Sequence, residues 1–212
     1  MFDININVNN ELEPPMPLTE KLKVISGIFG IRLGEEPEYY LIRSHGEKEI
    51  RKYGELTLAS ITVPVHGDHQ RAQAQAYSAL SNYIFGKNQS AQQMAMTAAV
   101  LHEDKPQQDG AAYLTMTFIL PSKFNIENAP APIDERIKIH QKSAHMVACR
   151  VYSGPNDESK VQKYTSELRE WLDQYSSYKA ASEVQVAEYD GPSTIPFLRK
   201  NEVHIDVEGA RY

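Results

Sequence analysis

Y-Y-L-I-R-S-H-G-E-K-E-I-R-K-Y, residues 39–53, contains two runs that are typical of β-strands, 39–43 and 48–53. Gly46 and the adjacent His45 separate the two runs and indicate a turn. Glu49 and Arg51 stand two residues apart, so both side chains lie on the same face of the second strand. The stretch therefore predicts a hairpin whose charged pair orients Tyr53 or braces the sheet.

The pattern continues with a strand over 56–63 and then a helix. Asp68 is placed to cap the helix, Gly86 ends it after Phe85, and its apolar stripe is Ala72, Ala76, Leu80 and Tyr83. Two more strands follow, the second over 113–120. The first half of the chain thus reads as strands, a helix and strands.

The second half repeats this order. After strands that include Ile137–His140 and His145–Val151, Asn156 is placed to cap a second helix. The apolar side of this helix comprises Val161, Leu168, Leu172 and Tyr175. In the last strand, Val203, Ile205 and Val207 are expected to point inward, and Glu202, His204 and Asp206 outward. The repeated order indicates an internal structural duplication and an α+β fold.

Further motifs occur in a fixed order along the chain: Glu49, Arg51 and Tyr53; Tyr83, Ile84, Gly86 and Asn88; Met96–Val100; Pro130 and Pro132; Tyr189, Asp190 and Pro192; and Arg199, Asn201, Glu202 and Val203. This set resembles the SOUL haem-binding protein family over roughly residues 36–208. The resemblance implies a distorted, mostly antiparallel, eight-stranded β-barrel. Two long helices would flank it, in a pseudo-two-fold repeat of strand-helix-strand-strand units.

The resemblance also implies a tetrapyrrole groove between the first long helix and the loop before the last strand. Carried onto this chain, one wall is Arg71, Ala74, Tyr77, Ser78 and Ser81, and the other is Thr194, Ile195, Phe197, Leu198 and Arg199. Apolar contact would hold the macrocycle, and Arg71, Arg199 and Lys200 could bind the propionates. In the alternative interpretation, Ile195, Phe197 and Leu198 pack as core and the arginines are solvated.

The sequence offers no convincing iron ligand. Lys52 stands where a histidine is proposed as an axial ligand in the family. The pair His66 and His69 lacks a nearby third ligand, His140 and His204 fall on expected solvent faces, and His145 shares a face with apolar neighbours. Tyr77 could ligate iron as a phenolate, although an aromatic residue at helical spacing usually packs. Reversible haem binding by apolar and electrostatic contact is therefore expected, without a structural metal.

Composition limits the class of protein. The 212 residues carry a net charge of -6 with no basic block, which argues against nucleic acid as a partner. The single cysteine, Cys149, allows no intramolecular disulfide, and neither a signal peptide nor a transmembrane segment is evident. We expect a cytoplasmic monomer with a tail over 1–17, an amphipathic helix over 18–34 and one domain over 35–212.

A catalytic function is the main rival to ligand binding. A groove glutamate such as Glu49 or Glu188, paired with a tyrosine, could act as a general acid or base. However, the sequence has no G-x-S-x-G, H-E-x-x-H or P-loop motif, so we expect a non-catalytic binding protein. Two alternatives stay open, namely a small-molecule-binding or hydrolase-like domain of the same repeat fold, and a protein-interaction module that uses the helix near residues 18–29.

Overall fold

The computed structural model describes residues 34–106, 111–174, 177–191 and 194–209. The predicted tail and, except for residue 34, the predicted amphipathic helix lie outside these residues. The elements, in chain order, are β1 (Tyr39–His45), β2 (Lys48–Tyr53), β3 (Leu56–Val65), α2 (His69–Ile84), β4 (Val100–Pro106), β5 (Ala112–Ile119), β6 (Lys138–Lys142), β7 (His145–Ser153), α3 (Glu158–Gln174), β8 (Tyr178–Ala180), β9 (Gln185–Glu188), the 3-10 turn η1 (Pro196–Leu198) and β10 (Lys200–Gly209).

The ten strands form one antiparallel sheet in the order β1-β2-β7-β10-β9-β4-β5-β3-β6, and β8 pairs with β10 beside this path. On one side of the central β4–β9 pair the order is β5, β3, β6, and on the other side it is β10, β7, β2. The segments β3-α2-β4-β5 and β7-α3-β9-β10 therefore occupy corresponding places in the sheet. The predicted α+β class, with an antiparallel sheet and two long helices, is confirmed.

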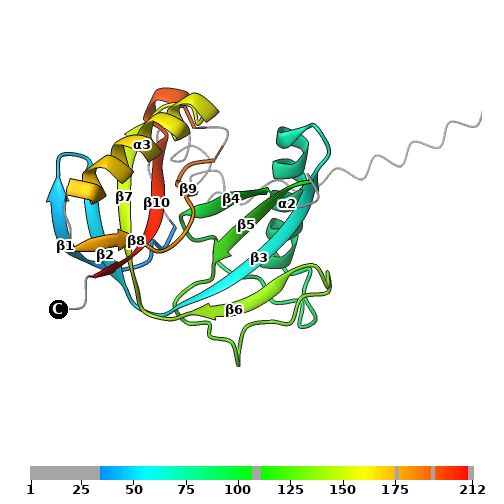
Figure 1. Ribbon diagram of the computed structural model, residues 1–212. Helices are drawn as coiled ribbons and strands as arrows, with labels where there is room; N and C mark the ends of the chain where they lie inside the picture. The colour runs from blue at the N-terminus through cyan, green and yellow to red at the C-terminus, as the bar shows by residue number, and fades with distance from the viewer. Residues whose placement is uncertain (1–33, 107–110, 175–176, 192–193, 210–212) are drawn as a thin grey trace, which may run out of the picture.

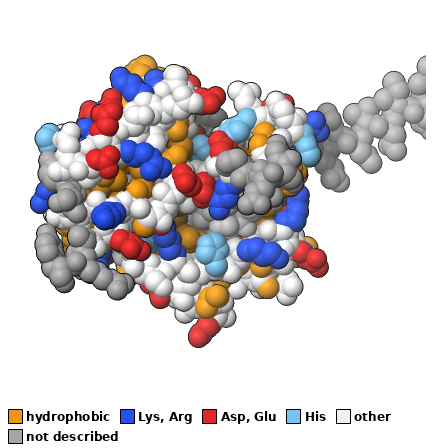
Figure 2. Space-filling model, in the orientation of Figure 1, with side chains coloured by type: hydrophobic (Ala, Val, Ile, Leu, Met, Phe, Trp, Pro, Cys, Tyr) orange, Lys and Arg blue, Asp and Glu red, His pale blue; other side chains and the backbone are white. Residues whose placement is uncertain are grey.

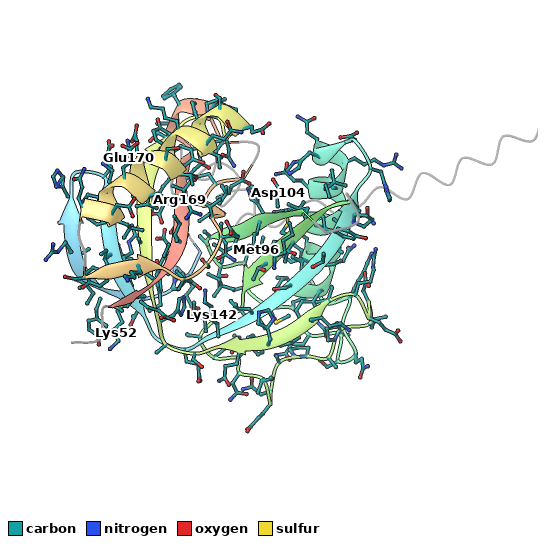
Figure 3. The ribbon with its side chains drawn as sticks, viewed as in Figure 1. Lys52, Met96, Asp104, Lys142, Arg169 and Glu170 are labelled. Atoms are coloured by element: carbon teal, nitrogen blue, oxygen red, sulfur yellow. The ribbon has the colours of Figure 1, made fainter. Side chains whose placement is uncertain are left out.

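The closed eight-stranded barrel is not confirmed. β1 and β6 are the two ends of the path, and no strand pairing joins them in the part of the chain that the structure describes. An ion pair nevertheless joins the two halves, since Lys142 Nζ on β6 lies 2.7 Å from Asp206 Oδ2 on β10. Lys142 accordingly lies between the two halves of the sheet in Figure 3.

Each helix covers one half of the outer face of the curled sheet (Figure 1). α2 packs on β3 and β5, where the predicted stripe of Ala72, Ala76, Leu80 and Tyr83 is buried. α3 packs on β7, β8 and β10 through Leu168 and Leu172, together with Trp171, which the sequence analysis missed. The molecule thus has a separate apolar core under each helix. Among the described residues, no helix is long and apolar enough to cross a membrane.

The two helix starts differ from each other. Asp68 caps α2 as predicted, because its side chain accepts a hydrogen bond from the Arg71 backbone N–H. For α3 the prediction of Asn156 was wrong by one residue, since Asp157 Oδ1 accepts from the Lys160 N–H at 2.9 Å. The Asn156 side chain is used elsewhere, and accepts from the Tyr152 hydroxyl at 2.7 Å.

Candidate functional site

The charged motif of β2 lies on the concave face of the sheet, opposite the helices. Arg51 is 2% exposed and binds the Glu202 carboxylate of β10 with two nitrogens, at 2.9 and 3.1 Å. Its Nε donates to Glu49 at 2.6 Å, and another nitrogen reaches the Tyr53 hydroxyl at 3.4 Å. A bidentate pair of this kind fixes both side chains. The motif therefore braces β2 against β10, which was one of the roles expected from the sequence.

Glu202 is the centre of this network. Its side chain is fully buried, and its Oε2 also accepts from the Tyr189 hydroxyl at 3.0 Å and contacts His204 Nε2 at 2.6 Å. Burial alone would raise the pKa of Glu202, but the hydrogen bonds and charges of His204 and Arg51 outweigh it and lower the pKa. Glu202 is therefore a satisfied, ionised anchor rather than a general acid.

Cys149, Glu202 and His204 form the one group among the described residues in which three potential metal ligands converge, with ligand atoms within 4.8 Å of one another. Two cations already neutralise its carboxylate, because Lys200 Nζ lies 3.3 Å from Glu202 in addition to Arg51. Burial raises the pKa of the Cys149 thiol, so the thiolate that a metal prefers is disfavoured. The chemistry of this group fits a hydrogen-bond network better than a metal centre.

The expected outward direction of Glu202, His204 and Asp206 was wrong. Val203, Ile205 and Val207 do face the core under α3, but His204 is only 8% exposed, on the opposite face. Both faces are covered because the sheet curls, so its concave side encloses a cavity of about 330 Å³. Its lining includes Tyr53, Leu58, Leu101, Glu103, His140, Lys142, His145, Val147, Gln185, Tyr189, His204 and Asp206.

The predicted groove residues of α2 lie on the other side of the sheet from this cavity. Arg71, Ala74 and Ser78 are exposed on one side of the helix. Tyr77 is 41% exposed, and its ring meets that of Phe118 edge-on at 5.5 Å. Ser81 differs from the rest, because its Oγ is buried without a hydrogen-bond partner among the described residues. Four of the five predicted residues thus form an accessible surface.

The predicted loop residues lie directly before β10. Phe197 is 71% and Leu198 37% exposed, so the alternative that these two pack as core is wrong. Ile195 is half-buried and Thr194 is 2% exposed. Arg199 Nε donates to the Thr194 carbonyl at 2.9 Å, which holds the turn. The loop therefore presents an uncovered apolar surface on a hydrogen-bonded frame.

Two strands separate the helix from this loop. Phe118, beneath Tyr77, pairs with Val100 of β4, Val100 pairs with Glu188 of β9, and Glu188 pairs with Asn201 of β10. Three strand spacings place β5 and β10 about 14 Å apart. The two predicted walls are therefore set apart along the sheet, and both border the outer face of β4 and β9.

A polar group centred on His102 lies on this face and was not predicted from the sequence. The His102 side chain is 7% exposed, with Nε2 3.6 Å from Glu188 Oε1, and Asn156 Nδ2 donates to the same oxygen at 2.8 Å. Burial raises the pKa of Glu188, but the hydrogen bond and charge of His102 outweigh it and lower the pKa. The alternation of Leu101 and Glu103 with His102 along β4 is the signal that could have placed the histidine on the outer face.

The other candidate ligands remain separated. Lys52 is exposed on β2, and His69 Nε2 contacts Asp104 Oδ1 at 2.8 Å on the surface. His140 is exposed at the rim of the concave cavity, and His145 is half-buried. Figure 2 shows basic, acidic and histidine side chains interspersed over the visible face. That face has no broad region of one charge.

Comparisons with known proteins give one family match and several shared folds. The model of the family described as SOUL heme-binding protein matches residues 34–206. Heme-binding protein 1 of Mus musculus is 28% identical over 131 residues, which cover 61% of this chain and 68% of that protein. Two solved structures share the fold alone. The EcmrR C-terminal domain has a TM-score of 0.56 and 12% identity, and the match covers 81% of this chain and 99% of that one. A hydrolase from Listeria innocua has a TM-score of 0.53 and 11% identity, and the match covers 79% of this chain and 94% of that one.

Proposed function

This chain belongs to the SOUL heme-binding protein family, and from that premise we propose that it binds haem or a related tetrapyrrole reversibly, as a non-catalytic carrier or buffer. The proposed site is the outer surface between α2 and the loop before β10. The observation that carries it is the exposed apolar surface on both sides, Tyr77 on the helix and Phe197 and Leu198 on the loop. These three side chains would give a macrocycle apolar contact from both sides of the site.

Arg71 is the cation best placed for a propionate. Its side chain is exposed and makes no ion pair among the described residues, whereas Arg199 holds the loop and Lys200 contacts Glu202. Haem would be held chiefly by apolar and electrostatic contact, since His102 is enclosed beside Glu188. No residue is assigned as an iron ligand, and no structural metal is needed.

A carrier is favoured over an enzyme by the state of the polar motif residues. Arg51, Glu202 and Tyr189 satisfy one another in the interior, and burial raises the pKa of the Cys149 thiol. Such groups stabilise a fold but offer no activated nucleophile or free general base. The proposed carrier is a cytoplasmic monomer that does not bind nucleic acid, in keeping with its net charge of -6.

A haemin titration followed by absorbance tests this function. We expect saturable binding, and we expect Arg71→Ala to weaken it by on the order of 1 kcal/mol, because a charge-assisted hydrogen bond to a propionate is lost. Arg136→Ala is the matched control, since Arg136 is exposed but already paired with Asp134 at 2.6 Å. Equal loss of affinity in the two variants would contradict a role of Arg71, and the absence of saturable binding would contradict the function.

A further inference from the structure

The concave cavity lies on the face of the sheet that the helices do not cover. Its volume of about 330 Å³ lies at the small end of ligand pockets, and part of its wall is apolar, including Leu58, Leu101 and Val147. The rings of Tyr53 and Tyr189 complete that part. A compact ring system would therefore fit the cavity better than a large macrocycle.

A poorly paired carboxylate lines the same cavity. The Glu103 side chain is only 16% exposed, yet its contacts to Lys105 Nζ, at 3.6 Å, and to Gln185 Nε2, at 3.4 Å, are both long. Lys105 itself is 51% exposed. A largely buried carboxylate is stabilised when short, charge-assisted hydrogen bonds replace its lost hydration. Glu103 thus has acceptor capacity for a cationic group in the cavity.

A neutral imidazole adds a second acceptor. His145 Nδ1 lies 2.9 Å from the Ser143 carbonyl, which can only accept, so Nδ1 carries a proton, and in the neutral ring Nε2 keeps its lone pair. Burial and the charges of Lys142 and His204 lower the pKa of His145, and together they outweigh the Ser143 hydrogen bond and the charge of Asp206, which raise it. The ring also stacks on Tyr53, with centroids 5.6 Å apart and planes 19° apart. His145 is therefore held as a neutral acceptor in the wall.

We propose that the concave cavity binds a compact organic cation, with a ring against the apolar wall, an ammonium group that donates to Glu103 and a second donor, such as a ring N–H, that faces His145. Lys142 is neutralised by Asp206, with contacts of 2.7 and 2.9 Å, so it does not dominate the charge of the cavity. This site is independent of the proposed haem surface. It lies on the opposite face of the sheet and takes a ligand of the opposite charge.

Three indoles with the same ring test the proposal. Tryptamine carries an ammonium group, tryptophol a neutral hydroxyl and indole-3-propionate a carboxylate, and each is titrated calorimetrically into the full chain at pH 7.5. Tryptamine is expected to bind at least about tenfold more tightly than the other two, as expected for one charge-assisted hydrogen bond. Equal affinities, tighter binding of the propionate or no saturable tryptamine binding would overturn the proposal.

Variants locate the ammonium group. Glu103→Gln keeps the shape of the side chain but removes its charge, so it should abolish the preference for tryptamine over tryptophol. His145→Phe keeps a ring against Tyr53, removes the Nε2 acceptor and should weaken tryptamine binding severalfold. Glu183→Gln is the control, because the Glu183 side chain is 80% exposed and does not line this cavity. Unchanged tryptamine preference in Glu103→Gln, or displacement of tryptamine by haemin at one shared site, would refute the assignment while leaving haem binding intact.

Discussion

Replacing Arg51 by alanine is expected to lower the free energy of unfolding by about 3–5 kcal/mol, the usual cost of removing one partner of a buried ion pair. Glu202 is fully buried and would lose both bidentate hydrogen bonds at once. Urea denaturation followed by circular dichroism measures the change. A loss below about 1 kcal/mol, as for an exposed pair, would contradict the structural role of the motif.

Two further variants separate the charge pair from packing. Arg136→Ala removes an exposed ion pair and should change stability by less than about 1 kcal/mol. In the double variant Arg51→Met with Glu202→Leu no charge of the pair is left uncompensated, so it should be more stable than Arg51→Ala alone. If the double variant is less stable than Arg51→Ala, the other hydrogen-bond partners of Arg51 and Glu202 contribute more to stability than the pair itself does.

The same network makes the protein sensitive to acid. The pKa of Glu202 is lower in the folded than in the unfolded chain, so its ionised form adds stability at pH values above the unfolded pKa. That contribution is lost as the pH falls toward the folded pKa. Arg51→Ala removes one cause of the lowered pKa, and the dependence of its stability on pH below about 4 should therefore be flatter.

Replacing Leu168 by alanine is expected to lower the free energy of unfolding by about 2–5 kcal/mol, since a fully buried leucine leaves both lost contacts and a cavity. Leu168 belongs to the core under α3, and Leu80 is likewise fully buried in the core under α2. The cost should be similar for Leu80→Ala. Chemical denaturation of both variants tests whether each half depends on its own core.

A surface leucine that belongs to neither core provides the control for the two core variants. Leu41 lies on β1 and is 54% exposed, so Leu41→Ala should change stability by less than about 0.5 kcal/mol. A loss near that of Leu168→Ala would mean that β1 is buried against something other than the described residues. Thermal unfolding of the three leucine variants in parallel gives this ranking.

Local signals explain which parts of the fold could be predicted from the sequence. The helix α2 could be predicted from the capping residue Asp68, an apolar stripe and the terminating Gly86, whose φ of 104° favours glycine. For α3 the apolar stripe was sufficient, but the cap was assigned to Asn156 because the partner of its side chain, Tyr152, cannot be inferred from spacing alone. Helices were thus predictable, whereas the hydrogen-bond partner that each polar side chain selects was not.

The curvature of the sheet limited the prediction of the site. Alternation along β10 separates two faces, but it does not say that the second face is enclosed, so His204 was assigned to solvent. The buried pair of Arg51 and Glu202 joins residues 151 positions apart and needed the pairing of β2, β7 and β10. The exposure of Phe197 likewise depends on the path of the loop. Such features arise from tertiary contacts and not from local pattern.

Paramagnetic broadening in an amide NMR spectrum tests the central claim most directly. Ferric haemin is added to the full chain and compared with gallium protoporphyrin, which has the same ring and propionates but no unpaired electrons. We predict that haemin broadens the resonances of 71–81 and 194–199 and leaves those of His140 and His145 sharp, because the latter line the opposite face of the sheet. Broadening centred on the concave cavity, or none on α2, would contradict the proposed haem surface.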